Sequence, residues 1–259
     1  MTIQSIKGFK DILPDEIPPW EFAEAVLRRL FKSFRYLEIR LPVLEETALF
    51  DRSIGTGTDI VEKEMYTFDD RDGKRISLRP EGTASVIRAY IEHHLKGTLP
   101  LVKLFYMGPM FRHERPQKGR FRQFHQTGAE AIGDSGPLLD AEQIFLLSLF
   151  FEEIGIKEAR LEINSVGCSN CRPPYKKILQ DYLRKKENAL CENCRRRIET
   201  NPLRVLDCKG ESCQEALKDA PEILRYLCEE CASHFGEVKK GLEALKIPFW
   251  INPDRKSVV

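Results

Sequence analysis

The sequence predicts an α+β fold in which helices flank an antiparallel sheet, followed by a helical segment rich in cysteine. Three observations lead to this prediction. Segments typical of strands and of helices follow one another without the regular strand–helix–strand period of a parallel sheet. Residues 103–133 have the pattern of a long hairpin. All eight cysteines lie between Cys168 and Cys231.

The first elements mix helix and strand. Apolar residues recur at helical spacing over 17–36, with two prolines at the start, so this segment predicts a helix. Residues 37–43 alternate as a strand that ends near a proline. Two further strands, 65–68 and 75–78, flank an Asp-Gly turn, and the apolar run 84–95 predicts a helix.

The hairpin at 103–133 comes next. Two alternating runs predict its strands, and the loop Arg115–Gly119 between them contains Pro and Gly. The apolar run 139–154 then predicts a helix, and its wide apolar surface indicates burial against the sheet. Residues 158–165 predict another strand.

The hairpin carries a high density of positive charge. Between Lys103 and Arg122 there are six Lys or Arg residues against one Glu. A solvated loop tip is the ordinary explanation for a charged loop, but here Phe111, Phe121 and Phe124 are interleaved with the charges. Guanidinium groups bind phosphate oxygens in pairs, so the pattern favours a site for phosphate and a flat ring.

Composition excludes several classes of protein. At 259 residues the chain can hold one large domain or two smaller ones, and a net charge of +1 gives no overall attraction to nucleic acid, so DNA is not expected as a partner. No apolar run could span a bilayer and no signal peptide is evident. Clustered cysteines argue against a secreted, disulfide-linked fold and for a reducing, cytoplasmic compartment.

The segment Arg79–Thr83 lies where the strand 75–78 meets the helix 84–95. Glu81 and Thr83 could cap that helix, or they could bind a ligand. The residues alone leave these two alternatives open.

The cysteines occur as four pairs, and two pairs can close one tetrahedral Cys₄ zinc site, so the segment could hold two structural zinc ions. Free or redox-active thiols are the alternative, but clustering of all eight favours metal. The pairs are Cys168 with Cys171, Cys191 with Cys194, Cys208 with Cys213, and Cys228 with Cys231. Between Arg172 and Lys209, eleven basic residues face five acidic ones, which suits either phosphate contact or a solvated helical surface.

Several of these stretches resemble one known family. FRHERPQKGRFRQFHQTGAEAIG, at 111–133, resembles motif 2 of the class II aminoacyl-tRNA synthetases in the form found in histidyl-tRNA synthetases. KGFKDILP at 7–14, LEIRLPVLEETALF at 37–50, which is similar to motif 1, and the block 58–90 match the same family in the expected order. The resemblance runs to about Pro253.

The resemblance implies a two-step ligase reaction with histidine, ATP and tRNA(His) as substrates and Mg²⁺ on the phosphates. It implies that Arg112 is catalytic, contacting the α-phosphate and the substrate carboxylate. Arg120 would contact the γ-phosphate, Glu114 would accept the adenine amino group, and Phe124 would stack on the adenine ring.

The same resemblance assigns the amino-acid and tRNA sites. Glu81 would bind the α-ammonium group of histidine with the help of Thr83, and Gln126 and Glu130 would meet its imidazole and amino group. Arg115 and Gln117 are candidates for tRNA contact. The segment around motif 1 implies a homodimer.

The implied domains are a catalytic domain at 1–166, the cysteine-rich insertion at 167–236, and the start of a return to the catalytic domain at 237–259. After Pro253 the family continues into a second catalytic arginine, motif 3 and an anticodon-binding domain, whereas this sequence reads Asp254–Val259. We therefore expect a fragment, or a truncated gene product, that does not charge tRNA alone.

Two other functions compete with the ligase. A non-catalytic relative could sense histidine as a regulatory subunit, but such relatives tend to lose the ATP-binding arginines and the tRNA loop, which are present here as Arg112, Arg120 and 115–119. A zinc-bound RNA-binding module would explain the cysteines but not the first 165 residues.

Overall fold

The computed structural model describes residues 3–55, 58, 60–97 and 99–252. The sequence blocks that include Asp59, Pro253 and 254–259 therefore lie partly or wholly outside the described residues. The chain divides into two compact units, one made of 1–135 with 149–155 and the other of 136–148 with 156–259. The domain bounds expected from the resemblance stay a prediction.

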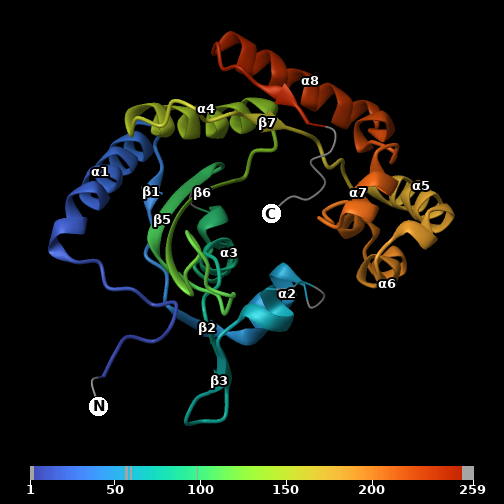
Figure 1. Cartoon of the computed structure of the whole chain (residues 1–259). Coiled ribbons are helices and arrows are strands. Elements are labelled where there is room, and N and C mark those ends of the chain that lie inside the picture. Colours follow the sequence, from blue (N-terminus) through green and yellow to red (C-terminus); the bar gives the residue numbers. More distant parts are fainter. Residues whose placement is uncertain (1–2, 56–57, 59, 98, 253–259) are drawn as a thin grey trace. The chain divides into compact units, whose positions relative to one another are not determined.

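The central sheet of the first unit has the strand order β1-β5-β6, with β1 at Leu37–Glu38, β5 at Val102–Phe111 and β6 at Gln123–Ile132. β5 and β6 pair antiparallel along their whole lengths and form the long curved hairpin in Figure 1. This confirms the predicted hairpin and the α+β class. β1 runs parallel to β5, so the sheet is mixed rather than wholly antiparallel.

Helices cover both faces of β5. On one face α1 (Ile17–Ser33) stacks Phe31 on Phe105, with ring centroids 4.4 Å apart. On the other face α3 (Thr83–Glu92) buries Val86 in a cluster with residues at even positions of β5. Because successive strand residues point to opposite faces, two covered faces explain why β5 is apolar at odd and even positions alike. The even-numbered members are Val102, Leu104, Tyr106 and Met110.

A second sheet in the same unit has the order β2-β4-β3, with β2 at Leu44–Glu46, β3 at Thr67–Asp69 and β4 at Arg75–Leu78. The predicted Asp-Gly turn joins β3 to β4, and its Gly73 has a φ of 77°, which glycine adopts without strain.

A buried hydroxyl group connects this second sheet to α2 (Thr47–Ile54). The Ser77 hydroxyl lies 2.9 Å from the hydroxyl of Thr47 and 2.9 Å from that of Thr67. Ser77 is fully buried, so these contacts satisfy a polar group that would otherwise be costly in the core.

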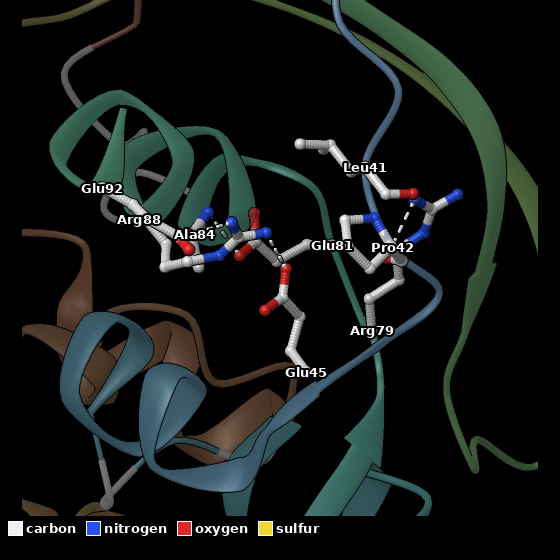
Figure 2. Close-up of polar contacts among 8 residues, drawn as sticks. All are labelled: Leu41, Pro42, Glu45, Arg79, Glu81, Ala84, Arg88 and Glu92. Atoms are coloured by element: carbon white, nitrogen blue, oxygen red, sulfur yellow. Dashed lines mark hydrogen bonds and ion pairs between the residues drawn. The ribbon is translucent and has the colours of Figure 1, made fainter. Parts of the chain in front are cut away.

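The buried guanidinium of Arg79 joins three segments of the first unit. Its Nε donates to the carbonyl of Pro109 at 2.9 Å. Its Nη1 donates to the carbonyls of Leu41 and Pro42 at 2.7 and 3.3 Å (Figure 2). A Cβ on Gly108 would lie 2.7 Å from Arg79 Nη2, so glycine makes room for the guanidinium there. Arg79 thereby holds the chain that follows β1 against β5.

Arg88 provides a second cross-link. Its Nη2 lies 2.7 Å from the carboxylate of Glu45 on β2, and its Nη1 lies 2.7 Å from Glu92, one turn further along α3 (Figure 2). This pairing fixes α3, whose N-terminus reaches the candidate site, against the second sheet.

Among the described residues, the second unit has two hydrophobic clusters. One joins the part of α4 (Pro137–Glu153) that includes Ala141 to the strands β7 (Glu162–Ile163) and β8 (Trp250–Ile251) and the helix α8 (Glu229–Ala244). The other forms the core of the cysteine-rich segment, whose helices are α5 (Arg172–Lys185), α6 (Glu192–Thr200) and α7 (Glu211–Leu217).

Short helical turns complete the described chain, and none of its helices has the length and apolar character needed to cross a membrane. The turns are η1 (Pro14–Glu16), the π-helical η2 (Ile60–Glu64), η3 (Leu95–Gly97), η4 (Glu187–Ala189), η5 (Pro202–Val205) and η6 (Ile223–Tyr226).

Two predicted strands are shorter than the sequence indicated. Of 37–43 only β1 pairs, because beyond the Ile39 N–H bond to Phe105 the carbonyls of Leu41 and Pro42 bind Arg79 instead of a neighbouring strand. Of 158–165 only β7 pairs, in parallel with the two residues of β8.

Two predicted helices also differ in detail. The helix predicted at 84–95 ends at Glu92, since His94 adopts a φ of 53°, which a right-handed helix does not allow. The helix predicted at 139–154 forms as α4, in which Ala141 and Leu146 are buried and most other residues are half-buried. Its burial against the sheet stays a prediction.

Replacing Arg79 with Met should destabilise the first unit. The substitution removes the guanidinium that donates to the carbonyls of the half-buried residues Leu41 and Pro109. A carbonyl left unsatisfied away from water costs about 1–3 kcal/mol. Urea unfolding followed by circular dichroism should show a loss of about 3 kcal/mol. The matched control is Arg75→Met, an exposed arginine on β4, which should change little. Equal stability of the two variants would contradict this role for Arg79.

Candidate active site

The hairpin register places the predicted site residues of β6 on one face of the sheet. Residues directly opposite one another in an antiparallel pair share a face. The even positions of β6 therefore lie on the face that α3 covers, beside the even positions of β5. The pairs are Phe124 with Met110, Gln126 with Gly108, Gly128 with Tyr106, and Glu130 with Leu104.

Arg112 follows β5 and is held in place by backbone and ring contacts. Its Nε donates to the carbonyl of Pro80 at 2.9 Å, and its guanidinium carbon lies 5.2 Å from the ring centroid of Phe124. Its backbone N–H donates to the Arg122 carbonyl at 2.8 Å. A guanidinium stacked on an aromatic ring keeps its charge and is oriented in advance. The structure thus brings together Arg112 and Phe124, two residues to which the resemblance assigns ATP contacts.

Glu114 pairs with the two predicted phosphate-binding arginines. Its carboxylate lies 3.2 Å from Arg120 and 4.0 Å from Arg112. The Arg120 side chain is 62% exposed, whereas that of Glu114 is 20% exposed. The arginine of this ion pair is therefore open to solvent, and its carboxylate partner is largely covered. Paired backbone groups of Gln117 and Arg120 close the loop that carries the exposed Arg115 and Gln117.

Glu81 caps helix α3 in this structure. Its carboxylate accepts the backbone N–H group of Thr83 at 2.5 Å. It also accepts the backbone N–H group of Ala84 at 2.9 Å (Figure 2). The capping alternative raised by the sequence is therefore present. A carboxylate at a helix N-terminus is stabilised by the helix dipole, and this fixes the position of Glu81 beside the sheet.

Thr83 joins Glu81 to Glu130. The Thr83 hydroxyl donates to Glu130 Oε1 at 2.7 Å. Burial raises the pKa of Glu130, and the nearby Glu81 carboxylate raises it further. Two carboxylates held this close favour a bound cation, because a positive group would relieve both effects.

Gln126 lies on the same face, on the strand between Phe124 and Glu130. Its side-chain oxygen is buried and has no hydrogen-bond partner among the described residues. A buried acceptor without a partner is unusual in a native protein. The unpaired oxygen is consistent with a ligand that supplies an N–H group.

Tyr106 belongs to this site although the sequence did not single it out. Its ring is wedged between two glycines: a Cβ on Gly82 or on Gly128 would lie 2.3 Å from it. Burial raises the pKa of Tyr106 to about 12, so its hydroxyl stays neutral beside Thr83 and Glu130. The sequence feature that could have indicated this role is Gly128, because it lies opposite the large Tyr106 ring in the hairpin.

The block 7–14 contacts the hairpin at its loop end, where β5 ends and β6 begins. The Gly8 carbonyl accepts the N–H groups of Arg122 and Gln123 at 2.8 and 3.2 Å, and the Phe9 ring contacts Phe111 and Tyr66. Gly8 has a φ of 90°, and a Cβ there would lie 2.7 Å from the Arg122 side chain. We could not predict the position of this segment from the sequence.

The eight cysteines form two groups of four, and none is in a disulfide. Hydrogen bonds from the backbone lower the pKa of Cys171 to about 6 and that of Cys191 to about 7. Burial raises the pKa of Cys194 and Cys213. The groups are Cys168, Cys171, Cys228 and Cys231, and Cys191, Cys194, Cys208 and Cys213.

Comparison with known proteins identifies the family. A family model described as histidyl-tRNA synthetase matches residues 8–234, so the chain belongs to the histidyl-tRNA synthetase family. It is 54% identical over 252 residues to a histidine–tRNA ligase of Syntrophotalea carbinolica and 53% identical over 250 residues to one of Geobacter sulfurreducens. These alignments cover 97% and 96% of this chain but 60% of each relative, so the chain spans about 60% of their length.

Solved structures agree with this assignment. The apo histidyl-tRNA synthetase of S. aureus superposes with a TM-score of 0.77 at 36% identity, covering 97% of this chain and 57% of that one. A protein from Bacillus halodurans, described as an ATP phosphoribosyltransferase regulatory subunit/histidyl-tRNA synthetase, has a TM-score of 0.62 at 20% identity and covers 95% and 65%. At that identity the second match shows the shared fold alone.

Replacing Glu130 with Gln should stabilise the protein, and increasingly so at higher pH. A raised pKa means that the folded state disfavours the ionised carboxylate. The penalty is absent where Glu130 is protonated in both states, develops as pH rises above about 4, and persists at neutral pH. Gln retains an oxygen for Thr83 but has no charge to bury.

The measurement is urea unfolding of wild type and variant between about pH 3 and 8, a range that begins below the pKa of an unfolded glutamate. The stability difference in favour of Glu130→Gln should grow as the pH rises above about 4 and then level off once Glu130 is ionised in both states. Glu46→Gln, at an exposed glutamate, should show no such trend. A variant that is less stable than wild type at every pH would contradict the prediction.

Proposed function

We propose that the whole protein is a cytoplasmic histidine–tRNA ligase. It activates histidine with ATP to form histidyl-adenylate, and then transfers the histidyl group to tRNA(His). The observation that best supports this is the arrangement of one sheet face, where a cationic group stacked on an aromatic ring and a pair of carboxylates lie at opposite ends of one strand pair. That arrangement suits a phosphate and an amino acid bound side by side.

ATP is proposed to occupy the Arg112 end. Phe124 would stack on the adenine ring and Glu114 would accept its amino group, while Arg120 would move from Glu114 to the γ-phosphate. The attack of a carboxylate on the α-phosphate brings two anions together, so the charge of Arg112 would lower the barrier by neutralising both. Mg²⁺ bound together with ATP would supply further positive charge against the phosphates.

Histidine is proposed to occupy the carboxylate end. Its α-ammonium group would bind between Glu81 and Glu130, which would offset the raised pKa of Glu130. The unpaired oxygen of Gln126 would accept an imidazole N–H group. Thr83 would orient Glu130 through the hydrogen bond that they already share. A neutral Tyr106 would add a polar contact without adding charge.

The remaining partners are proposed from the family. Arg115 and Gln117 stand exposed on the hairpin loop, where an incoming tRNA acceptor end could reach them. The segment from α1 through 37–50 would form a homodimer interface. The two groups of cysteines would bind structural zinc, since thiolate sulfur is a preferred zinc ligand and the groups lie apart from the hairpin in sequence.

The competing function is a histidine-sensing regulatory subunit without catalysis. It would need the amino-acid end of the site but not the anchored Arg112 or the Arg120–Glu114 pair. The presence of both, held by specific contacts, favours the ligase.

Replacing Arg112 with Ala should lower histidine-dependent ATP–pyrophosphate exchange by roughly 10²–10³. The test uses a version of the protein extended to the length of its relatives. Lys118→Ala, on the same hairpin loop, serves as the control and should keep the wild-type exchange rate. Exchange by Arg112→Ala at that rate would remove Arg112 from the reaction.

Replacing Glu81 with Gln should raise the KM for histidine more than the KM for ATP. The amide can still accept one backbone N–H group at the start of α3, but it lacks the charge proposed to bind the α-ammonium group. Steady-state exchange kinetics in the same extended protein measure both constants. An equal rise in the two constants, together with a lowered Tm, would indicate that Glu81 acts only as a helix cap.

A further inference from the structure

We propose that the eight cysteines form two separate tetrathiolate zinc sites in nested order, an outer site that joins the ends of the cysteine-rich segment and an inner site within its core. The outer site consists of Cys168, Cys171, Cys228 and Cys231, and the inner site of Cys191, Cys194, Cys208 and Cys213. This inference rests on the zinc binding proposed above and adds which pairs share an ion and what each ion holds together.

The sulfur–sulfur distances fit a tetrahedral metal site. Within each group all four sulfur atoms lie within 4.8 Å of one another. Cys168 Sγ is 3.7 Å from Cys171 Sγ and 3.9 Å from Cys228 Sγ, and Cys191 Sγ is 4.0 Å from Cys208 Sγ. Zinc–sulfur bonds of about 2.3 Å in a regular tetrahedron place the sulfurs about 3.8 Å apart. A disulfide would require about 2.05 Å.

Backbone N–H groups point at the sulfur atoms of the outer site. The N–H of Cys228 donates to Cys171 Sγ at 3.0 Å, and the N–H of Asn170 donates to Cys168 Sγ at 3.3 Å. Four thiolates around a divalent ion leave a net negative charge, and such donors offset it while orienting the ligands. Gly167, with a φ of 62°, makes the tight turn into this site, and a Cβ there would lie 2.6 Å from Cys171.

Backbone N–H groups also donate to sulfur atoms of the inner site. The N–H of Cys191 donates to Cys213 Sγ at 3.2 Å, and the N–H of Gly210 donates to Cys208 Sγ at 3.5 Å. The two sites therefore have the same kind of donor set although they share no cysteine.

The position of the outer site along the chain gives it a distinct role. Cys168 and Cys171 immediately precede α5, and Cys228 and Cys231 begin α8. An ion bound there closes residues 172–227 into a loop, which restricts the unfolded chain as a long-range cross-link does.

The inner site is part of the hydrophobic core of that loop. Cys194 and Cys213 have no exposed surface and pack with Leu179 and Leu190. Buried thiols brought together from α6 and α7 would have to carry charge to bind metal, so the ion itself must compensate them. We therefore expect the inner site to control folding of the segment and the outer site to control closure of its ends.

The four sulfur ligands of each site determine which kind of metal ion can bind there. Four sulfur ligands exclude hard ions such as Mg²⁺ and Ca²⁺ and leave no coordination position for a substrate, so each ion is structural. Zn²⁺ is the ion expected, and iron is distinguished from it by elemental analysis.

The test is metal content in paired variants of the chain, measured by elemental analysis after purification without chelators. Wild type and the control Ser169→Ala should contain about two zinc ions per chain. Cys171→Ser should contain about one. Adding Cys231→Ser, in the same proposed site, should remove no further ion, whereas combining Cys171→Ser with Cys194→Ser should remove both.

The opposite result would overturn the nested order. If neighbouring pairs along the sequence shared ions, Cys171→Ser with Cys231→Ser would lose both ions, and Cys171→Ser with Cys194→Ser would lose one. Circular dichroism on the double variant Cys171→Ser/Cys231→Ser checks that the inner core remains helical. This control distinguishes loss of both ions through unfolding from loss through a different pairing of the cysteines. A metal-free, folded wild type would refute both this inference and the zinc binding on which it rests, but not the ligase proposal.

Discussion

The register of the β5–β6 hairpin is the constraint on which the rest of the site depends. Because side chains alternate along a strand, a slip of one residue would turn Phe124, Gln126 and Glu130 from the α3 face to the α1 face. The wedged ring of Tyr106 opposes such a slip, since only glycine at position 128 leaves room for it. Arg79 contacts β5 at Gly108 and Pro109. Because Arg79 lies a few residues before α3, this contact also fixes the N-terminus of α3 relative to the hairpin.

The candidate site retains features that do not favour stability. Glu130 has a raised pKa, Gln126 has a buried oxygen without a partner, and Glu81 adds a second negative charge to the same region. A protein selected for stability alone would place apolar or paired groups there. Each of these costs would be reduced by one ligand that has an ammonium group and an imidazole N–H group. The groups that cost stability at this site are therefore the same groups that are proposed to bind histidine.

Much of the hairpin could be predicted from the sequence because its signals are local: alternation, a loop with Pro and Gly, and a high density of Arg. The Asp-Gly turn and the helix after Arg79–Thr83 were predictable for the same reason. The carbonyl contacts of Arg79, the wedged position of Tyr106 and the parallel pairing of β1 depend on residues far apart in the chain. Likewise, the spacing of the cysteines indicated metal binding, but the grouping of the first pair with the last needed the fold.

The central claim is that one face of the hairpin binds ATP and histidine together for adenylate formation. The most direct measurement is ATP–pyrophosphate exchange by a protein of the full length of its relatives, with each standard amino acid supplied in turn. The account predicts exchange with histidine and not with the other amino acids. A folded protein that binds histidine yet catalyses no exchange with it would contradict the account and indicate a non-catalytic sensor of histidine.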